Sequence, residues 1–199
     1  KRFIKTEHTT PESIDLNKLL SEMANEGVEY VTMEVSSHSL ALYRVYGIEF
    51  DIVLFTNLTP EHLDFHKSMD DYFSAKKILF DSVKRINSKG YRTAAIYNCD
   101  DEYGEKIASS TEGERIAYGF GCGAYAAKNL EMNFDGMSFD VLVPRNGDDV
   151  GKIRVKTGLT GRFNVYNILA SIVALKSIGI KYKSIVEAIE EFKPVDGRF

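Results

Sequence analysis

Residues 51–80 read DIVLFTNLTPEHLDFHKSMDDYFSAKKILF, and this stretch decides the fold class of the chain. It begins with a short apolar run, residues 51–58, of the kind that is buried on both faces in a parallel sheet. The helical pattern that follows, residues 69–86, gathers its apolar side chains on one stripe. A buried strand followed by a one-sided helix is typical of a βαβ unit.

The same alternation extends along the chain. Further apolar, β-rich runs occupy residues 29–35 and 92–98, and helical patterns occupy residues 13–27, 101–110, 161–180 and 184–192. We therefore predict an α/β fold with a doubly wound, mostly parallel sheet flanked by helices. Between residues 115 and 161 short apolar runs alternate with glycine-containing turns, which predicts a small antiparallel β-subdomain. Its strands are expected at residues 115–120, 137–143 and 152–159.

Composition narrows the class of partner. With 199 residues, 44% of them hydrophobic, the chain is large enough to bury one substantial core. A net charge of −4 provides no basic field for nucleic acid or anionic lipid, so we expect neither a nucleic-acid nor a membrane partner. No apolar run approaches the roughly 20 residues that span a bilayer. A small anion is the expected ligand.

The only two cysteines are Cys99 and Cys122. They are too few for a disulfide framework and lack the pair spacing of a metal site, which favours a reducing, cytoplasmic location. A single disulfide between them stays open as an alternative.

One lysine falls on the apolar stripe of the helix expected after residue 69. At about 100° per residue, Lys76 shares the face of Tyr72 and Ala75, whereas Lys77 points away. A buried ammonium is costly unless it is paired or loses its proton. Its stem could lie along the core while the amine reaches solvent or a nearby aspartate. Alternatively, a neutral amine could take up carbon dioxide and become an anionic carbamate ligand.

Two histidines, His62 and His66, lie four residues apart in PEHLDFH. This spacing could suggest a transition-metal pair, but the third ligand is undefined and the HExxH order is absent. His62 follows the carboxyl end of a predicted buried strand, where clefts form in open α/β sheets, so a site role and a structural role are both open. His66 is expected to be structural or to face solvent.

A carboxylate, Glu34, ends the apolar run of residues 29–35. Such a group requires a cation, and Mg²⁺ beside a nucleotide phosphate fits because it prefers oxygen ligands. Glu34 could instead cap the following turn or pair with Arg44. Ser36 could bind a polar ligand or cap a helix. Near the other end, Asn164 and Asn167 lie three apart in a helix's first turns, where they could read a base edge or serve as caps.

Seven blocks of sequence, in this order, resemble the central domain of the Mur ligases. They are TTPESIDL (9–16), YVTMEVSSHSLALYRV (30–45), FTNLTPEHLDFH (55–66), SAKKILF (74–80), YNCDDEYG (97–104), GRFNVYNILA (161–170) and DGRF (196–199). Within the family they are most similar to the branch that extends UDP-N-acetylmuramoyl-L-alanyl-D-glutamate by the third amino acid of the peptidoglycan stem peptide. The resemblance implies a bacterial, ATP-dependent amide ligase whose fold is like that of P-loop NTPases.

The resemblance assigns roles by position. It implies that Mg²⁺ is held by Glu34, His62 and Lys76, with the lysine as N6-carboxylysine. It implies that the UDP-muramoyl-peptide is bound by His8, Thr9, Thr10, Ser36 and Arg44. It implies that ATP is bound by Asn164, Asn167 and Arg198. The chain departs from the family at His8, where some members have asparagine, and at Leu42, where a glutamine often contacts substrate.

Residues 1–199 are expected to be a truncated central domain of this family. The family's glycine-rich ATP loop is expected just before Lys1 and its amino-acid-binding domain just after Phe199, so this chain alone is expected to be inactive or nearly so. The added amino acid is expected to be meso-diaminopimelate or L-lysine. The alternatives are a ligase like folylpolyglutamate synthetase, a noncatalytic nucleotide-binding domain, and a metal-dependent hydrolase suggested by the two histidines.

Overall fold

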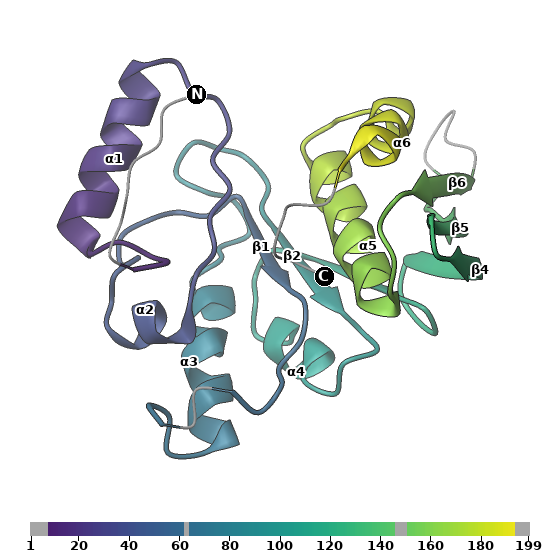
Figure 1. Ribbon diagram of the computed structural model, residues 1–199. Coiled ribbons are helices and arrows are strands. Elements are labelled where there is room, and N and C mark those ends of the chain that lie inside the picture. The colour runs from purple at the N-terminus through teal and green to yellow at the C-terminus, as the bar shows by residue number, and fades with distance from the viewer. Residues whose placement is uncertain (1–7, 62–63, 146–150, 194–199) are drawn as a thin grey trace. The chain divides into compact units, whose positions relative to one another are not determined.

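The computed structural model describes residues 8–61, 64–145 and 151–193 (Figure 1). The chain divides into two compact units, residues 1–49 with 59–82 and residues 50–58 with 83–199. Two predicted site residues, His62 and Arg198, lie outside the described residues. The helices described in the first unit are α1 (Ser13–Asn25), α2 (Ser37–Ala41) and α3 (Met69–Asp81).

The first unit follows its sequence pattern in the helices but not in the expected strand. α1 ends ahead of Gly27, whose φ of +78° suits glycine, and α3 ends at Asp81, five residues earlier than predicted. Residues 29–35 were predicted as a strand, and that prediction is wrong: they belong to no strand of the structure. Tyr30 is 63% exposed, so this apolar run is not enclosed in the way that a central strand would be.

The second unit is built on one sheet of six strands in sequence order. The strands are β1 (Ile52–Phe55), β2 (Ala94–Asn98), β3 (Glu114–Gly119), β4 (Tyr125–Asn133), β5 (Gly136–Leu142) and β6 (Lys152–Thr157). Neighbours from β1 to β4 pair in parallel, whereas β4, β5 and β6 pair antiparallel. The predicted α/β class is therefore confirmed as a mixed sheet flanked by helices.

The region of residues 115–161 differs in detail from the expectation. β3 pairs in parallel with β2, and only the strands from β4 onward pair antiparallel within the same sheet. β4 was not predicted. Its sequence, YAAKNLEMN, lacks a strict alternation, and its outer half is largely exposed. β4 forms a strand because its backbone pairs with β5, and this pairing cannot be recognised from the local sequence.

Helices cover both faces of the sheet. They are α4 (Gly104–Ala108), α5 (Arg162–Ser177) and α6 (Tyr182–Glu191). Ile96 of β2 belongs to the core under α5, whereas the next residue, Tyr97, donates from its hydroxyl to Glu105 of α4 at 2.7 Å. Since successive strand residues point to opposite faces, α4 and α5 lie on opposite sides of β2. Within the described residues, no helix is long and apolar enough to cross a membrane.

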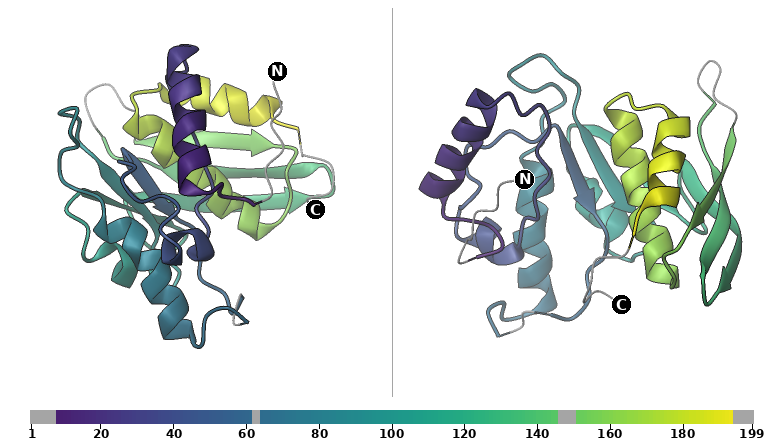
Figure 2. Two further views of the ribbon diagram at one scale, coloured as in Figure 1. Left: turned by 90° about the vertical axis from the view of Figure 1, so that its left-hand side faces the viewer. Right: turned by 45° about the horizontal axis from the view of Figure 1, so that its top comes forward.

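The main core lies between the sheet and the helices α5 and α6, which lie beside each other on one face of the sheet (Figure 2). α5 packs against β1 to β4, and α6 packs against β6. Phe139 of β5 and Val155 of β6 are register partners, and both are fully buried. Leu169 and Ile172 of α5 are also fully buried in this core. The core therefore anchors α5, the helix that carries the predicted base-reading asparagines.

A disulfide joins Cys99, just after β2, to Cys122 in the loop between β3 and β4. This is the alternative that the sequence left open. Asp100 holds the same loop by accepting hydrogen bonds from the backbone N–H groups of Phe120 and Gly121. Hydrogen bonds and the disulfide therefore fix one loop together.

Removing this disulfide is expected to lower the free energy of unfolding by about 3 kcal/mol, because the bond closes a loop between residues 23 apart in sequence. Urea denaturation of the chain with and without a thiol reductant would measure the change. The Cys99→Ser, Cys122→Ser double variant should match the reduced chain and should not respond to reductant. Identical midpoints for the oxidised and reduced chains would contradict the expectation.

Candidate functional site

The inward-facing lysine lies where the helical period places it. α3 is capped by Ser68, whose side chain accepts a hydrogen bond from Asp71 N–H. The helix buries Tyr72 and Ala75 on the stripe that also carries Lys76. Lys77 on the next position pairs with Asp81. Both lysines are half-buried, and what distinguishes Lys76 is its Nζ, which lies 5.1 Å from the centre of the Tyr72 ring.

The surroundings of Lys76 act on its charge in two directions. Burial lowers the pKa of the Lys76 ammonium, and the carboxylates of Glu34 and Glu61 oppose that shift. The alternative drawn from the sequence was a pairing with aspartates at the start of the same helix; the carboxylates that act on the amine here are the two glutamates. The structure therefore brings Lys76 and Glu34 into one electrostatic neighbourhood within the first unit.

Thr10 connects the segment before α1 to the segment that carries Glu34. Its hydroxyl donates to the backbone carbonyl of Glu34 at 3.0 Å and accepts from the backbone N–H of Ser36 at 3.4 Å. Thr10 is 1% exposed. Ser36 itself caps α2 by accepting from Ser39 N–H at 3.1 Å, so the capping role open for Ser36 is present. Three predicted positions thus meet in one hydrogen-bonded cluster.

Arg44 completes this cluster. Its guanidinium donates to the backbone carbonyl of Thr10 at 3.2 Å and pairs with Glu12 at 2.6 Å. Arg44 is thus held by Glu12, not by Glu34, which was the alternative partner. The Nε of Arg44 is buried and meets no hydrogen-bond partner among the residues that the structure describes. A buried donor without an acceptor is costly.

The two positions before Thr10 lie at the surface. His8 is near Glu12, with 4.0 Å between Nε2 and Oε1, and its side chain is half exposed; Thr9 is exposed. Leu42, the other departure from the family pattern, is 52% exposed. These side chains are open to solvent and so remain accessible to a ligand.

His66 is buried, which was the structural alternative for this residue. It is 5% exposed, its Nε2 lies 2.8 Å from Ser37 Oγ, and its ring stacks on Tyr72 with 5.1 Å between ring centres. Neither the contact of Ser37 with His66 nor a role for Tyr72 beyond the core was predicted. For Tyr72 a signal existed, because it precedes Lys76 by four residues and so lies beside it on the helix. No sequence signal predicted the contact between Ser37 and His66.

The donors present suit a hard divalent cation. Carboxylates of Glu34 and Glu61 act on the Lys76 amine, and oxygen ligands are those that Mg²⁺ prefers. Three or more His, Cys, Asp or Glu side chains are not gathered as a ready-made metal cluster anywhere in the described ranges, which omit His62. A carbamate on Lys76 would add an oxygen ligand to this acidic neighbourhood.

The asparagine pair belongs to the second unit. α5 begins after Gly161, whose φ is +90°. The Nδ2 of Asn164 donates to the carbonyl of Thr160 at 2.7 Å, and the Nδ2 of Asn167 donates to Asn164 Oδ1 at 3.2 Å. The two amides therefore lie together in the first turns of the helix, as their spacing predicted. Asn164 is half-buried and Asn167 is exposed.

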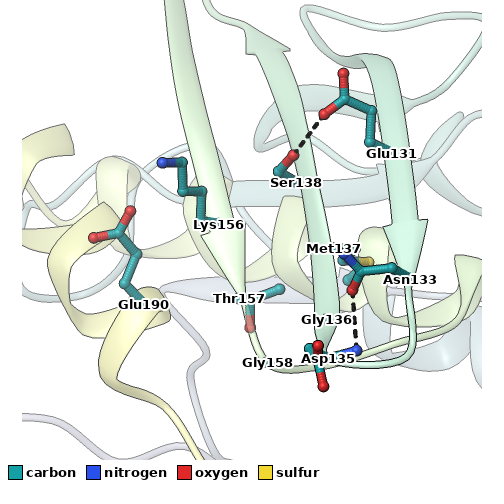
Figure 3. A pocket seen from close by; sticks show the side chains of 10 residues that line it. All are labelled: Glu131, Asn133, Asp135, Gly136, Met137, Ser138, Lys156, Thr157, Gly158 and Glu190. Atoms are coloured by element: carbon teal, nitrogen blue, oxygen red, sulfur yellow. Dashed lines mark hydrogen bonds between the residues drawn. The ribbon is translucent and has the colours of Figure 1, made fainter.

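A separate open cavity of about 560 Å³ lies beside the β4–β5 hairpin, β6 and Glu190 of α6 (Figure 3). None of the predicted site residues lines it. Its carboxylates are partly used within the protein: Glu131 accepts from Ser138 at 3.1 Å and from Arg154 at 2.9 Å. The cavity does not coincide with the candidate site.

Known proteins resemble this chain over most of its length. The family described as the Mur ligase middle domain matches residues 1–175. The UDP-N-acetylmuramoyl-L-alanyl-D-glutamate--2,6-diaminopimelate ligase of Clostridium botulinum is 42% identical over 98% of this chain and 38% of its own length. The corresponding L-lysine ligase of Staphylococcus haemolyticus is 40% identical over 96% of this chain and 37% of its own length. The chain thus spans little more than a third of these relatives.

Solved structures show the same fold. A UDP-N-acetylmuramoyl-L-alanyl-D-glutamate--2,6-diaminopimelate ligase matches 98% of this chain and 39% of its own, with a TM-score of 0.83 and 25% identity. The MurF ligase of Thermotoga maritima in complex with ADP matches 86% of this chain and 39% of its own, with a TM-score of 0.61 and 15% identity. The second likeness concerns the fold alone.

Proposed function

Because the chain belongs to the Mur ligase family, we propose that it is the central domain of an ATP-dependent ligase that adds the third amino acid to UDP-N-acetylmuramoyl-L-alanyl-D-glutamate. Besides family membership, the structural observation that supports the proposal is one hydrogen-bonded cluster formed by Thr10, Glu34, Ser36 and Arg44. These are positions that the family resemblance assigns to substrate and metal.

The reaction we propose has two steps. The γ-carboxylate of D-glutamate attacks the terminal phosphorus of ATP, which forms an acyl phosphate and releases ADP. The amine of the incoming amino acid then attacks the acyl carbon, phosphate leaves, and an amide forms as the amine loses a proton. The second step is favourable because phosphate is a far better leaving group than the hydroxide of a free acid.

We propose that Glu34, His62 and Lys76 hold Mg²⁺, with Lys76 as its carbamate. When bound, Mg²⁺ neutralises phosphate oxygens and stabilises the charge that develops during phosphoryl transfer. Burial supports the carbamate, because it lowers the pKa of the Lys76 amine and so favours the neutral form that reacts with carbon dioxide. The carbamate would extend a negative oxygen group from a helix, a rigid support for a ligand.

We propose that His8, Thr9, Thr10, Ser36 and Arg44 bind the UDP-muramoyl-peptide. The buried Nε of Arg44 supports this, since an anionic oxygen of the substrate would satisfy it. We propose that Asn164 and Asn167 contact the adenine of ATP and that Arg198 reaches its phosphates. The net charge of −4 supports a small-molecule ligand over nucleic acid or a membrane surface. We propose that the enzyme is cytoplasmic.

The proposal predicts ADP release that depends on every substrate. The full-length protein that contains this chain should release ADP only when ATP, Mg²⁺, UDP-N-acetylmuramoyl-L-alanyl-D-glutamate and an amino acid are all present. Meso-diaminopimelate and L-lysine should be tested separately, because relatives of both kinds match the chain at similar identity. The 199-residue chain alone should show little or no turnover.

Three outcomes would contradict the proposal. Phosphate release without an amino-acid acceptor would indicate a hydrolase. Turnover with a folate and glutamate in place of the muramoyl substrate would indicate a folylpolyglutamate synthetase. Nucleotide binding by the full-length protein without any ADP release would indicate a noncatalytic domain.

A further inference from the structure

An aromatic stack joins α2 to α3 inside the first unit, where the two helices pack beside each other (Figure 1). The rings of His66 and Tyr72 are stacked, with 5.1 Å between their centres and 23° between their planes. Both residues are nearly inaccessible, at 5% and 4% exposed. Phe65 meets the His66 ring edge-on at 4.9 Å. The stack is therefore enclosed, and its members have little freedom to turn.

Tyr72 connects this stack to the proposed metal-binding residue, Lys76. The Nζ of Lys76 lies 5.1 Å from the centre of the Tyr72 ring, at the i, i+4 spacing that brings side chains together on a helix. A lysine side chain has four rotatable bonds and loses much rotamer freedom when it is held in one place. The aromatic ring limits where the amine can go.

On the other side of the stack, His66 contacts the helix α2. Its Nε2 lies 2.8 Å from the hydroxyl of Ser37, the first residue of α2. Ser37 follows Ser36 and is three residues after Glu34, so the hydrogen bond reaches the segment of the proposed carboxylate ligand. The contacts thus run from this segment through Ser37, His66 and Tyr72 to Lys76.

We propose that His66 and Tyr72 are positioning residues that fix the Lys76 side chain relative to the Glu34 segment. This inference rests on the proposed function, in which Lys76 and Glu34 are ligands of one metal site. Groups that orient metal ligands without touching the metal typically change metal affinity by 10- to 100-fold when they are removed. The stack would act in that way, holding the lysine so that its carbamate and the Glu34 carboxylate face a common ion.

The test uses the full-length protein and two readouts. The first is the carbamate signal of Lys76 in ¹³C NMR after equilibration with ¹³C-labelled bicarbonate, which requires neither ATP nor turnover. The second is the Mg²⁺ concentration that gives half-maximal ADP release. Tyr72→Leu removes the ring and keeps apolar bulk, and it should weaken the carbamate signal and raise the Mg²⁺ requirement about 10- to 100-fold. Tyr72→Phe keeps the ring and should restore both readouts.

Two further variants separate positioning from loss of fold. Ser37→Ala deletes the hydrogen bond to His66 without opening the core, and it should shift both readouts in the same direction by less than Tyr72→Leu. Tyr103→Leu is the matched control. The ring of Tyr103 lies 5.2 Å from Lys106 Nζ, so it forms a similar pair outside the proposed site and should change neither readout.

The outcomes distinguish this inference from the proposed function. The inference is overturned if Tyr72→Leu and Ser37→Ala both keep the wild-type carbamate signal and Mg²⁺ requirement while Lys76→Ala loses the signal and the activity. In that case the ligase proposal stands. If the wild-type protein gives no carbamate signal, the carbamate assignment and this inference fail together.

Discussion

Replacing Lys76 with alanine is expected to lower amino-acid-dependent ADP release about 10³-fold. The variant would lose the long side chain that presents an anionic oxygen to the metal, and a metal ion supplies several kcal/mol of transition-state stabilisation. About 4 kcal/mol corresponds to this factor in rate. The full-length protein should be assayed at saturating ATP, Mg²⁺ and muramoyl substrate, so that the change reports on the catalytic step.

The neighbouring lysine offers a matched control. Lys77 carries the same charge one position along α3, where it pairs with Asp81. Such i, i+4 pairs contribute only a few tenths of a kcal/mol, so Lys77→Ala should keep nearly full activity. Acetate or formate should restore part of the activity of the Lys76→Ala variant by supplying a free carboxylate, and should have no such effect on Lys77→Ala. Equal turnover of wild type and Lys76→Ala would remove this lysine from the mechanism.

The inward position of Lys76 could be predicted because it depends on one helix alone. The period of 3.6 residues fixes which side chains share a face, so Tyr72, Ala75 and Lys76 had to lie together once the helix formed. The same local reasoning predicted that Asn164 and Asn167 would meet in the first turns of α5. Spacing is sufficient when both partners belong to one regular element.

Contacts between elements could not be predicted from spacing. Ser37 and His66 are 29 residues apart and touch because α2 packs beside α3, and nothing in either local sequence specifies that packing. Thr10 and Glu34 are 24 residues apart, and the hydrogen bond from the Thr10 hydroxyl to the Glu34 carbonyl is likewise a contact that spacing does not predict. The family resemblance brought Thr10, Glu34, Ser36 and Arg44 together, whereas periodicity could not.

Strand prediction failed where pairing matters more than composition. Residues 29–35 are as apolar as many buried strands, yet they join no strand ladder in the described chain. β4 has a polar, irregular sequence, yet it is a strand because β5 pairs with it from Ala126 to Asn133. Apolar composition measures a tendency to be buried, and a strand also requires a partner for its backbone groups.

The largest expected loss of stability comes from the main core, at Phe139. Phe139 of β5 is fully buried in the core that also holds its register partner Val155 of β6 and Leu169 of α5. Truncating a buried phenylalanine to alanine removes its transfer free energy and leaves a cavity, so Phe139→Ala should lower the free energy of unfolding by about 4 kcal/mol. A domain is stable by only about 5–15 kcal/mol, so this variant should be close to unfolding at 37 °C.

A second phenylalanine, five residues earlier, provides the control for this prediction. Phe134 lies in the turn between β4 and β5 and is fully exposed, so Phe134→Ala removes the same atoms without opening a cavity. Its effect should stay within about 0.5 kcal/mol. Urea denaturation followed by far-ultraviolet circular dichroism would compare the two variants with the parent chain. Because the substitutions are chemically identical, the difference between them reports chiefly on burial. Equal midpoints would mean that Phe139 does not pack in the core that supports α5 and its two asparagines.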